Sequence, residues 1–370
     1  MNAGGIIAAF RERLPLPKNA PPLSLGEGNT PLVPLLRADL PDGIEIFAKV
    51  EGANPTASFK DRGMVAAAAA AKADGARCII CASTGNTSAS AAAYSARAGL
   101  PCVIVLPEGQ VAAGKIAQAI AHGAKMIQIR GNFDDAMAAV RSFADGGEAA
   151  VVNSINPMRL QGQKTAAFEI IAALGGAPDY HALPVGNAGN ITAHWIGYCE
   201  ASGCGTAACA FCGGVCNFRN APICDSRPKM LGYQAENAAP FVRGAPIKNP
   251  ETVATAIRIG NPQSFSAAKI AVADSGGRIG AVGDGAILAA QKQLAATEGI
   301  FCEPASAASV AGVLADIAAA KIVPPARIVC TLTGHGLKDP EIVGAPKMRV
   351  SGSDINSLRR AIDETICDGA

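Results

Sequence analysis

The chain has 370 residues, of which 49% are hydrophobic, 17% charged and 4% aromatic. This composition can bury a large core of small aliphatic side chains and excludes a disordered polyelectrolyte. The net charge of +2, with acids and bases interspersed, gives no sign of a nucleic-acid or membrane partner.

From residue 44 onward, short apolar runs alternate with longer alanine-rich segments. The apolar runs predict buried strands and the longer segments predict helices. Strands are predicted at 44–50, 78–82, 102–106, 126–129, 150–152, 180–185, 230–234 and 327–332. Helices are predicted at 61–73, 87–98, 112–122, 134–144, 161–174, 191–199, 284–297 and 305–320.

Alternating strands and helices indicate an α/β fold with two open parallel-sheet lobes that carry helices on both faces. We expect the lobes to divide near residues 153–157. The predicted organisation is an N-terminal segment at 1–52 packed on the large lobe, a small lobe at 53–155, a large lobe at 156–345 with a cysteine-rich insertion at 199–225, and a tail at 346–370.

No apolar run is long enough to cross a bilayer, and Arg11 and Arg13 follow the apolar N-terminal residues instead of preceding them as in a secretory signal. We therefore expect a cytoplasmic protein. In that compartment the 12 cysteines stay reduced or bind metal.

Several glycine-bearing turns follow predicted strands, where parallel sheets collect their ligands. They contain Ser83–Ser88, Gly186–Asn190 and Thr333–Gly336. Lys60 lies at the predicted start of a helix, whose positive end lowers the pKa of a lysine. A reactive amine combined with such turns suggests a phosphorylated aldehyde cofactor, although a lone lysine is more often a solvated surface residue.

The turn Gly186, Asn187, Ala188, Gly189 and Asn190 lies between a strand and a helix. Its backbone N–H groups and the helix dipole can cradle a phosphate. The alternative is an ordinary strand-to-helix turn.

The turn that begins at Ser83 and Thr84 offers N–H and O–H donors for a substrate carboxylate. The alternative is a cluster of helix-capping residues.

In chain order, five motifs resemble those of the threonine synthases, which are pyridoxal-phosphate enzymes of fold type II in the tryptophan-synthase-β group. These motifs are Thr56–Gly63, Ser83–Thr87, Pro184–Asn190, Glu303–Ala308 and Thr331–Asp339. The resemblance extends from about Gly26 to Asp339, and His335 stands where the family usually has asparagine.

The resemblance implies that Lys60 is the Schiff-base lysine and that Asn86 donates to the ring hydroxyl of the cofactor. The Gly186–Asn190 turn would bind the cofactor phosphate, and Thr333 would contact the pyridine nitrogen. A neutral hydroxyl partner does not force that nitrogen to protonate, so the electron sink is milder than with an aspartate.

The implied substrate is O-phosphohomoserine, which adds a second phosphate. Arg159 can make a bidentate contact to phosphate oxygens. The implied phosphate ligands are Thr87, Asn153, Ser154 and Arg159, and Ser83 and Thr84 would bind the carboxylate. Without the resemblance, residues 153–159 are better explained as an interlobe hinge. The family also suggests a homodimer.

The cysteine-rich segment has no clear family counterpart. Cys204, Cys209 and Cys212 match part of a ferredoxin spacing, and together with Cys216 they are candidate metal ligands. The alternative is an exposed, variable insertion. Two other functions remain open. They are a threonine/serine dehydratase, whose substrate has no phosphate, and a metal-binding protein on a non-catalytic scaffold.

Overall fold

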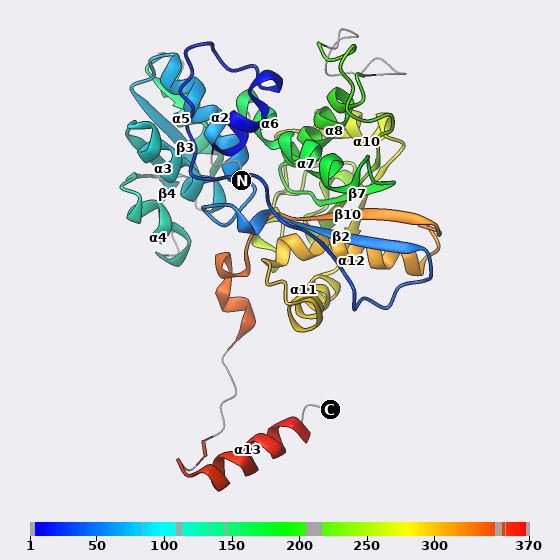
Figure 1. Cartoon of the computed structure of the whole chain (residues 1–370). Coiled ribbons are helices and arrows are strands. Elements are labelled where there is room, and N and C mark those ends of the chain that lie inside the picture. Colours follow the sequence, from blue (N-terminus) through cyan, green and yellow to red (C-terminus); the bar gives the residue numbers. More distant parts are fainter. Residues whose placement is uncertain are drawn as a thin grey trace. The chain divides into compact units, whose positions relative to one another are not determined.

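The computed structural model describes residues 4–83, 85–108, 113–131, 133–144, 147–154, 156–204, 217–344, 350–351 and 353–367. The chain divides into two compact units, Met1–Asp339 and Pro340–Ala370, and each is described by itself. The described residues of the second unit form a 3-10 turn, η6 (Pro340–Val343), and the helix α13 (Ile355–Cys367). All strands described below belong to the first unit, which contains two sheets (Figure 1).

The larger sheet has six strands in the order β1-β2-β10-β7-β8-β9. Neighbouring strands run parallel, except that β1 pairs antiparallel with β2 because the short loop between them cannot make a parallel crossover. The strands are β1 (Leu32–Pro34), β2 (Ile44–Val50), β7 (Tyr180–Pro184), β8 (Lys229–Ala235), β9 (Arg278–Val282) and β10 (Ala326–Leu332).

The smaller sheet has four parallel strands in the order β5-β4-β3-β6. They are β3 (Cys78–Ala82), β4 (Cys102–Pro107), β5 (Lys125–Ile129) and β6 (Ala149–Val151). This sheet therefore uses strands from residues 78–151, whereas β1 and β2 join the larger sheet.

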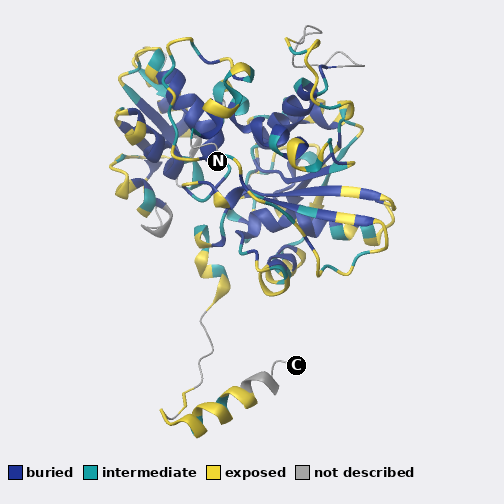
Figure 2. Ribbon diagram, viewed as in Figure 1, coloured by how far each residue is buried: buried dark blue, intermediate teal, exposed yellow. Residues whose placement is uncertain are grey.

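Helices cover both faces of each sheet, as the α/β prediction requires. In β3, Ile79 and Cys81 pack against α2 and α3, whereas Ile80 and Ala82 face the side of α5. Successive strand residues point to opposite faces, so a continuous apolar run fills two cores. Figure 1 shows α7, α8 and α10 on one side of the larger sheet and α11 and α12 on the other, and Figure 2 shows both interiors as buried.

The helices of the first unit mostly lie where the alternation predicts them. They are α1 (Gly5–Phe10), α2 (Lys60–Ala73), α3 (Asn86–Ala98), α4 (Ala113–Ala121), α5 (Phe133–Ala144), α6 (Pro157–Gln163), α7 (Thr165–Leu174), α8 (Gly189–Ala201), α9 (Pro240–Arg243), α10 (Phe265–Asp274), α11 (Asp284–Glu298) and α12 (Pro304–Ala318). Among the described residues, no helix is long and apolar enough to span a membrane.

One predicted helix is two. The segment 161–174 is interrupted at Lys164, which separates α6 from α7. The hydroxyl of Thr165 donates to the carbonyl of Gly162 (2.7 Å), and the buried amine of Lys164 pairs with Glu200 (2.7 Å). These side-chain bonds stabilise a break that apolar periodicity does not reveal.

The N-terminal segment contacts both cores. Strand β1 extends the larger sheet, whereas Ile6 and Ile7 of α1 pack among the helices of the smaller one. The domain limits drawn from the sequence stay a prediction.

Candidate active site

The turns that follow β2 and β10 lie side by side, because these two strands are neighbours. Beyond the strands, the N–H of Phe59 donates to the carbonyl of Thr333 (2.9 Å). The N–H of His335 donates to the carbonyl of Ala57 (3.0 Å). The structure thus brings Lys60 next to the Thr333 turn, although the two lie far apart in sequence.

Lys60 is the first residue of α2, and its Nζ lies 4.2 Å from the centroid of the Phe59 ring. Burial and the charge of Arg159 together lower the pKa of Lys60 to about 7, although the charge of Glu303 opposes the shift. A lysine with this pKa is largely neutral at slightly alkaline pH, and the neutral amine is the nucleophilic form.

The Gly186–Asn190 turn joins β7 to α8, a helix of 13 residues. Ala188 has a φ of 64°, in the left-handed region that non-glycine residues seldom adopt. Both polar atoms of the Asn190 side chain are buried and have no hydrogen-bond partner within the described part of the chain. A strained turn at the positive end of a helix, with unsatisfied polar atoms, suits phosphate binding.

Asn86 and Thr333 both contact the carboxylate of Glu303, a residue for which the sequence predicted no role. The Nδ2 of Asn86 donates to Glu303 Oε2 (3.1 Å), and the Oγ1 of Thr333 donates to Glu303 Oε1 (3.3 Å). Thr333 also shares a hydrogen bond with the hydroxyl of Ser306 (2.9 Å). Glu303 and Ser306 both belong to the Glu303–Ala308 motif, so the resemblance to threonine synthases could have pointed to them as site residues.

Arg159 lies on α6 and is 1% exposed. Its Nη1 donates to the carbonyl of Val152 (3.0 Å), whereas its Nε has no partner among the described groups. No carboxylate of the described residues forms an ion pair with it. Burial lowers the pKa of Arg159 to about 10. A buried guanidinium without a counter-ion is costly, so the site favours an anionic ligand.

The other predicted phosphate ligands differ in their surroundings. The amide of Asn153 bonds the backbone of Ala82 at both ends, accepting from its N–H (3.1 Å) and donating to its carbonyl (2.9 Å). It therefore ties the end of β6 to β3. Ser154 and Thr87 are half-buried.

Of the predicted carboxylate ligands, Ser83 shapes its own turn by accepting from the N–H of Gly85 (3.2 Å). Thr84 lies outside the described residues, as do Cys209, Cys212 and Cys216. Cys204 is buried just after α8. Within the described ranges, no group of three or more His, Cys, Asp or Glu side chains is placed to hold a metal.

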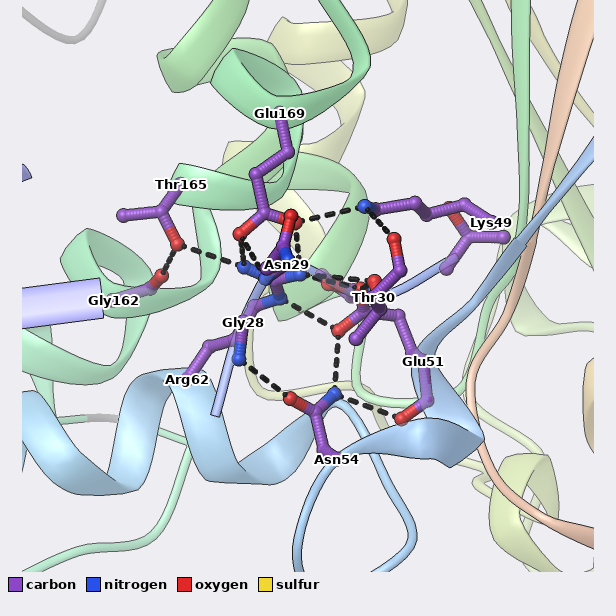
Figure 3. Close-up of polar contacts among 12 residues, drawn as sticks. Gly28, Asn29, Thr30, Lys49, Glu51, Asn54, Arg62, Gly162, Thr165 and Glu169 are labelled. Atoms are coloured by element: carbon purple, nitrogen blue, oxygen red, sulfur yellow. Dashed lines mark hydrogen bonds and ion pairs between the residues drawn. The ribbon is translucent and has the colours of Figure 1, made fainter. Parts of the chain in front are cut away.

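Two residues after Lys60, Arg62 lies in a buried charge cluster formed with Lys49, Glu51 and Glu169 (Figure 3). Arg62 contacts both carboxylates at 2.7 Å, and Lys49 contacts Glu169 at 2.8 Å. Although burial alone would raise it, the charge of Arg62 and its hydrogen bonds lower the pKa of Glu169 to about 2. The cluster joins β2, α2 and α7, so it fixes the start of the helix that carries Lys60.

Residues 23–334 match the model of the family described as pyridoxal-phosphate dependent enzyme. The chain is 52% identical to the threonine synthase of Halalkalibacterium halodurans over 339 residues, which cover 91% of this chain and 90% of that protein. It is 47% identical to the threonine synthase of Methanocaldococcus jannaschii, with 96% and 86% covered. The chain belongs to the threonine synthase family of pyridoxal-phosphate dependent enzymes.

Solved structures support the fold. A crystal structure of O-ureido-L-serine synthase has a TM-score of 0.68 at 20% identity and covers 90% of this chain and 96% of its own. The processed form of threonine deaminase isoform 2 from Solanum lycopersicum has a TM-score of 0.64 at 20% identity, with 86% and 82% covered. At this identity the likeness concerns the fold alone, and it confirms the predicted fold type II architecture.

Pyridoxal phosphate is the cofactor of this family, and the residues present fit it. A half-buried lysine with a lowered pKa, a phosphate-type turn with the buried amide of Asn190 and a buried hydroxyl at Thr333 are the features that fit. Each group of the cofactor therefore has a chemically suitable partner.

Proposed function

We propose that this site converts O-phosphohomoserine and water into L-threonine and phosphate, the reaction of a threonine synthase. The high identity to threonine synthases over nine-tenths of the chain supports the reaction. The observation that carries the substrate is the buried guanidinium of Arg159, which pairs with no carboxylate of the described residues and lies within electrostatic range of Lys60.

The cofactor would be held covalently by Lys60, with its phosphate at the Gly186–Asn190 turn, its ring oxygen at Asn86 and its ring nitrogen at Thr333. When bound, it supplies an electron sink for carbanions that form on the substrate. The assignments are supported by the lowered pKa of Lys60 and by the Asn190 amide, which no described group satisfies.

Arg159 is the proposed anchor for the substrate phosphate, aided by Thr87 and Ser154. Asn153 supports this region from behind, because its amide is committed to Ala82. The guanidinium would stabilise the phosphate as it leaves Cγ of the substrate, where negative charge accumulates. A dehydratase substrate has no phosphate to pair with this cation.

Lys60 is the proposed proton carrier. When it is not bound to the cofactor, its amine would remove the proton from Cα of the substrate and then one from Cβ. Its pKa of about 7 is matched to this work, since a general base is most effective near the operating pH. The same amine would return a proton at Cγ before water adds at Cβ, and one at Cα afterwards.

The test is to supply purified protein, loaded with pyridoxal phosphate, with O-phosphohomoserine and to measure phosphate and threonine together. The expected result is equal amounts of both. Serine and threonine serve as controls, because a dehydratase would release ammonia from them. Ammonia release from these controls, with no phosphate released from O-phosphohomoserine, would contradict the proposal.

The family resemblance also supports a homodimer in the cytoplasm as further proposals. Sedimentation equilibrium of the loaded protein tests the first, and a monomeric mass would contradict it.

A further inference from the structure

Glu303 stands at the N-cap of α12, yet its side chain makes no capping hydrogen bond there. N-caps favour the short side chains of serine, threonine, aspartate and asparagine. Helix capping therefore does not explain a glutamate at this position. Its carboxylate turns instead toward Asn86 and Thr333.

The two oxygens of this carboxylate accept from two different parts of the fold. Asn86 is the first residue of α3, beside the smaller sheet, and Thr333 follows β10 of the larger one. The amide of Asn86 has two N–H groups, and Glu303 engages one of them. This leaves the second N–H available for the cofactor and fixes which end of the amide is the donor.

The carboxylate is held tightly in place. A Cβ at Gly334 would lie 2.5 Å from Glu303 Oε1, closer than atoms can approach. The N–H of Glu303 donates to the carbonyl of Gly334 (3.0 Å), and the N–H of Gly334 donates to the hydroxyl of Ser306 (2.9 Å). A fixed acceptor can orient the groups that donate to it.

We propose that Glu303 is a positioning residue: it orients the Asn86 amide toward the cofactor and, by accepting the single O–H of Thr333, fixes the position of that side chain. The inference rests on the cofactor contacts proposed above for Asn86 and Thr333, and it is independent of the substrate. A carboxylate is suited to this task because both of its oxygens accept, whereas an amide accepts at one end and donates at the other.

The substitution Glu303→Gln keeps the shape of the side chain but must present an N–H₂ group to one of the two donors. The experiment measures the dissociation constant of pyridoxal phosphate by equilibrium dialysis for the wild type, Glu303→Gln, Asn86→Ala and the double variant. Each single variant is expected to bind about 10-fold more weakly, the loss typical of one charge-assisted hydrogen bond. Because Glu303 and Asn86 act together, the affinity of the double variant should fall by less than about 30-fold, whereas two independent residues would lower it about 100-fold.

The matched control is Glu27→Gln. Glu27 is also buried and accepts from Ile6, Leu25 and Tyr94, but it contacts neither Asn86 nor Thr333. Its affinity for pyridoxal phosphate should stay within about twofold of the wild type. At saturating cofactor, Glu303→Gln should also change the ratio of the visible absorption bands while the far-UV circular dichroism stays the same.

Additive losses in the double variant would overturn the proposal, as would a Glu303→Gln protein that binds cofactor like the wild type. If the glutamine variant does not fold, Glu303→Asp, which keeps the charge on a shorter side chain, is measured in the same cycle. Both readouts use the cofactor without substrate. A failure to make threonine would therefore count against the proposed function, whereas the role of Glu303 is decided by the cofactor measurements alone.

Discussion

At the residue scale, the amine of Lys60 lies where burial and the charge of Arg159 both disfavour its protonated form. The sequence predicts a lowered pKa from the helix dipole alone. The structure adds two causes that depend on contacts between segments far apart in the chain. One of them, Arg159, is also the proposed ligand of the substrate phosphate, so substrate binding would screen the charge that Lys60 feels.

We predict that Lys60 of the cofactor-free protein reacts with an amine-specific reagent with a midpoint near its pKa of about 7. A model lysine amine has a midpoint of about 10.4. The measurement is the pH dependence of labelling, followed by peptide mass spectrometry, with N-acetyl-lysine amide as the standard. Removing the opposing carboxylate with Glu303→Gln should shift the midpoint lower. A wild-type midpoint above about 9 would contradict the assigned environment.

Replacing the proposed phosphate ligand conservatively should separate substrate binding from cofactor binding. Arg159→Lys keeps a positive charge but loses the planar fork, so kcat/KM for O-phosphohomoserine should fall about 100-fold. Cofactor affinity and Tm should change little. The control is Arg77→Lys at an exposed ion pair with Glu148, where kcat/KM should not change. Equal losses in cofactor affinity and kcat/KM would argue against a role at the substrate.

At the element scale, α2 and α6 carry Lys60 and Arg159 and touch through two glycines. A Cβ at Gly162 would lie 2.0 Å from the carbonyl oxygen of Arg62, and one at Gly63 would lie 2.7 Å from that of Arg159. The backbones therefore approach as closely as glycine allows. This contact sets the spacing between the proposed base and the proposed phosphate ligand.

Gly162→Ala should force these helices apart. Overpacking of a close backbone contact typically costs about 1–3 kcal/mol, so we expect a loss of about 3 kcal/mol in the free energy of unfolding and a lower kcat/KM. Urea denaturation and steady-state kinetics measure the two effects. Gly285→Ala on α11 is the matched control, because a Cβ there meets open space. That variant should be unchanged or up to about 1 kcal/mol more stable, and equal behaviour of the two variants would refute the role of the contact.

At the scale of the whole molecule, the charge cluster of Lys49, Glu51, Arg62 and Glu169 joins β2 and α2 to α7, which lies far from them in sequence (Figure 3). It contains two cations and two anions, so it is formally neutral. Burying such a cluster without one member is strongly unfavourable. Its charge balance therefore affects the stability of the whole fold.

Glu169 should make the protein sensitive to acid. Its folded-state pKa of about 2 lies below the ordinary value of 4.5, so its contribution is complete above pH 4.5 and is lost as the pH falls toward 2. A shift of this size corresponds to about 3 kcal/mol. In Glu169→Gln, urea stability should be lower at about pH 6.5 and should fall less between about pH 6.5 and about pH 3.5 than in the wild type. Glu148→Gln, at a surface pair, should keep the wild-type slope, and an unchanged slope in Glu169→Gln would show that the cluster does not govern acid stability.

Much of the fold could be predicted because it depends on local patterns. Continuous apolar runs such as Ile79–Ala82 predict strands buried on both faces, and glycine-bearing turns predict where the strands end. The break at Lys164 and the antiparallel strand β1 escaped prediction. The first depends on a side-chain bond to Glu200, and the second on pairing with β2.

The sequence by itself determined the α/β class and predicted a reactive lysine and a phosphate-type turn, because periodicity and turn chemistry act over a few residues. Its resemblance to threonine synthases supplied the reaction. Only the tertiary structure decided that Glu303 accepts hydrogen bonds from both Asn86 and Thr333. It also decided that Arg159 is buried without a carboxylate partner among the described residues. Such facts depend on burial and on contacts between segments far apart in the chain, which no local pattern encodes.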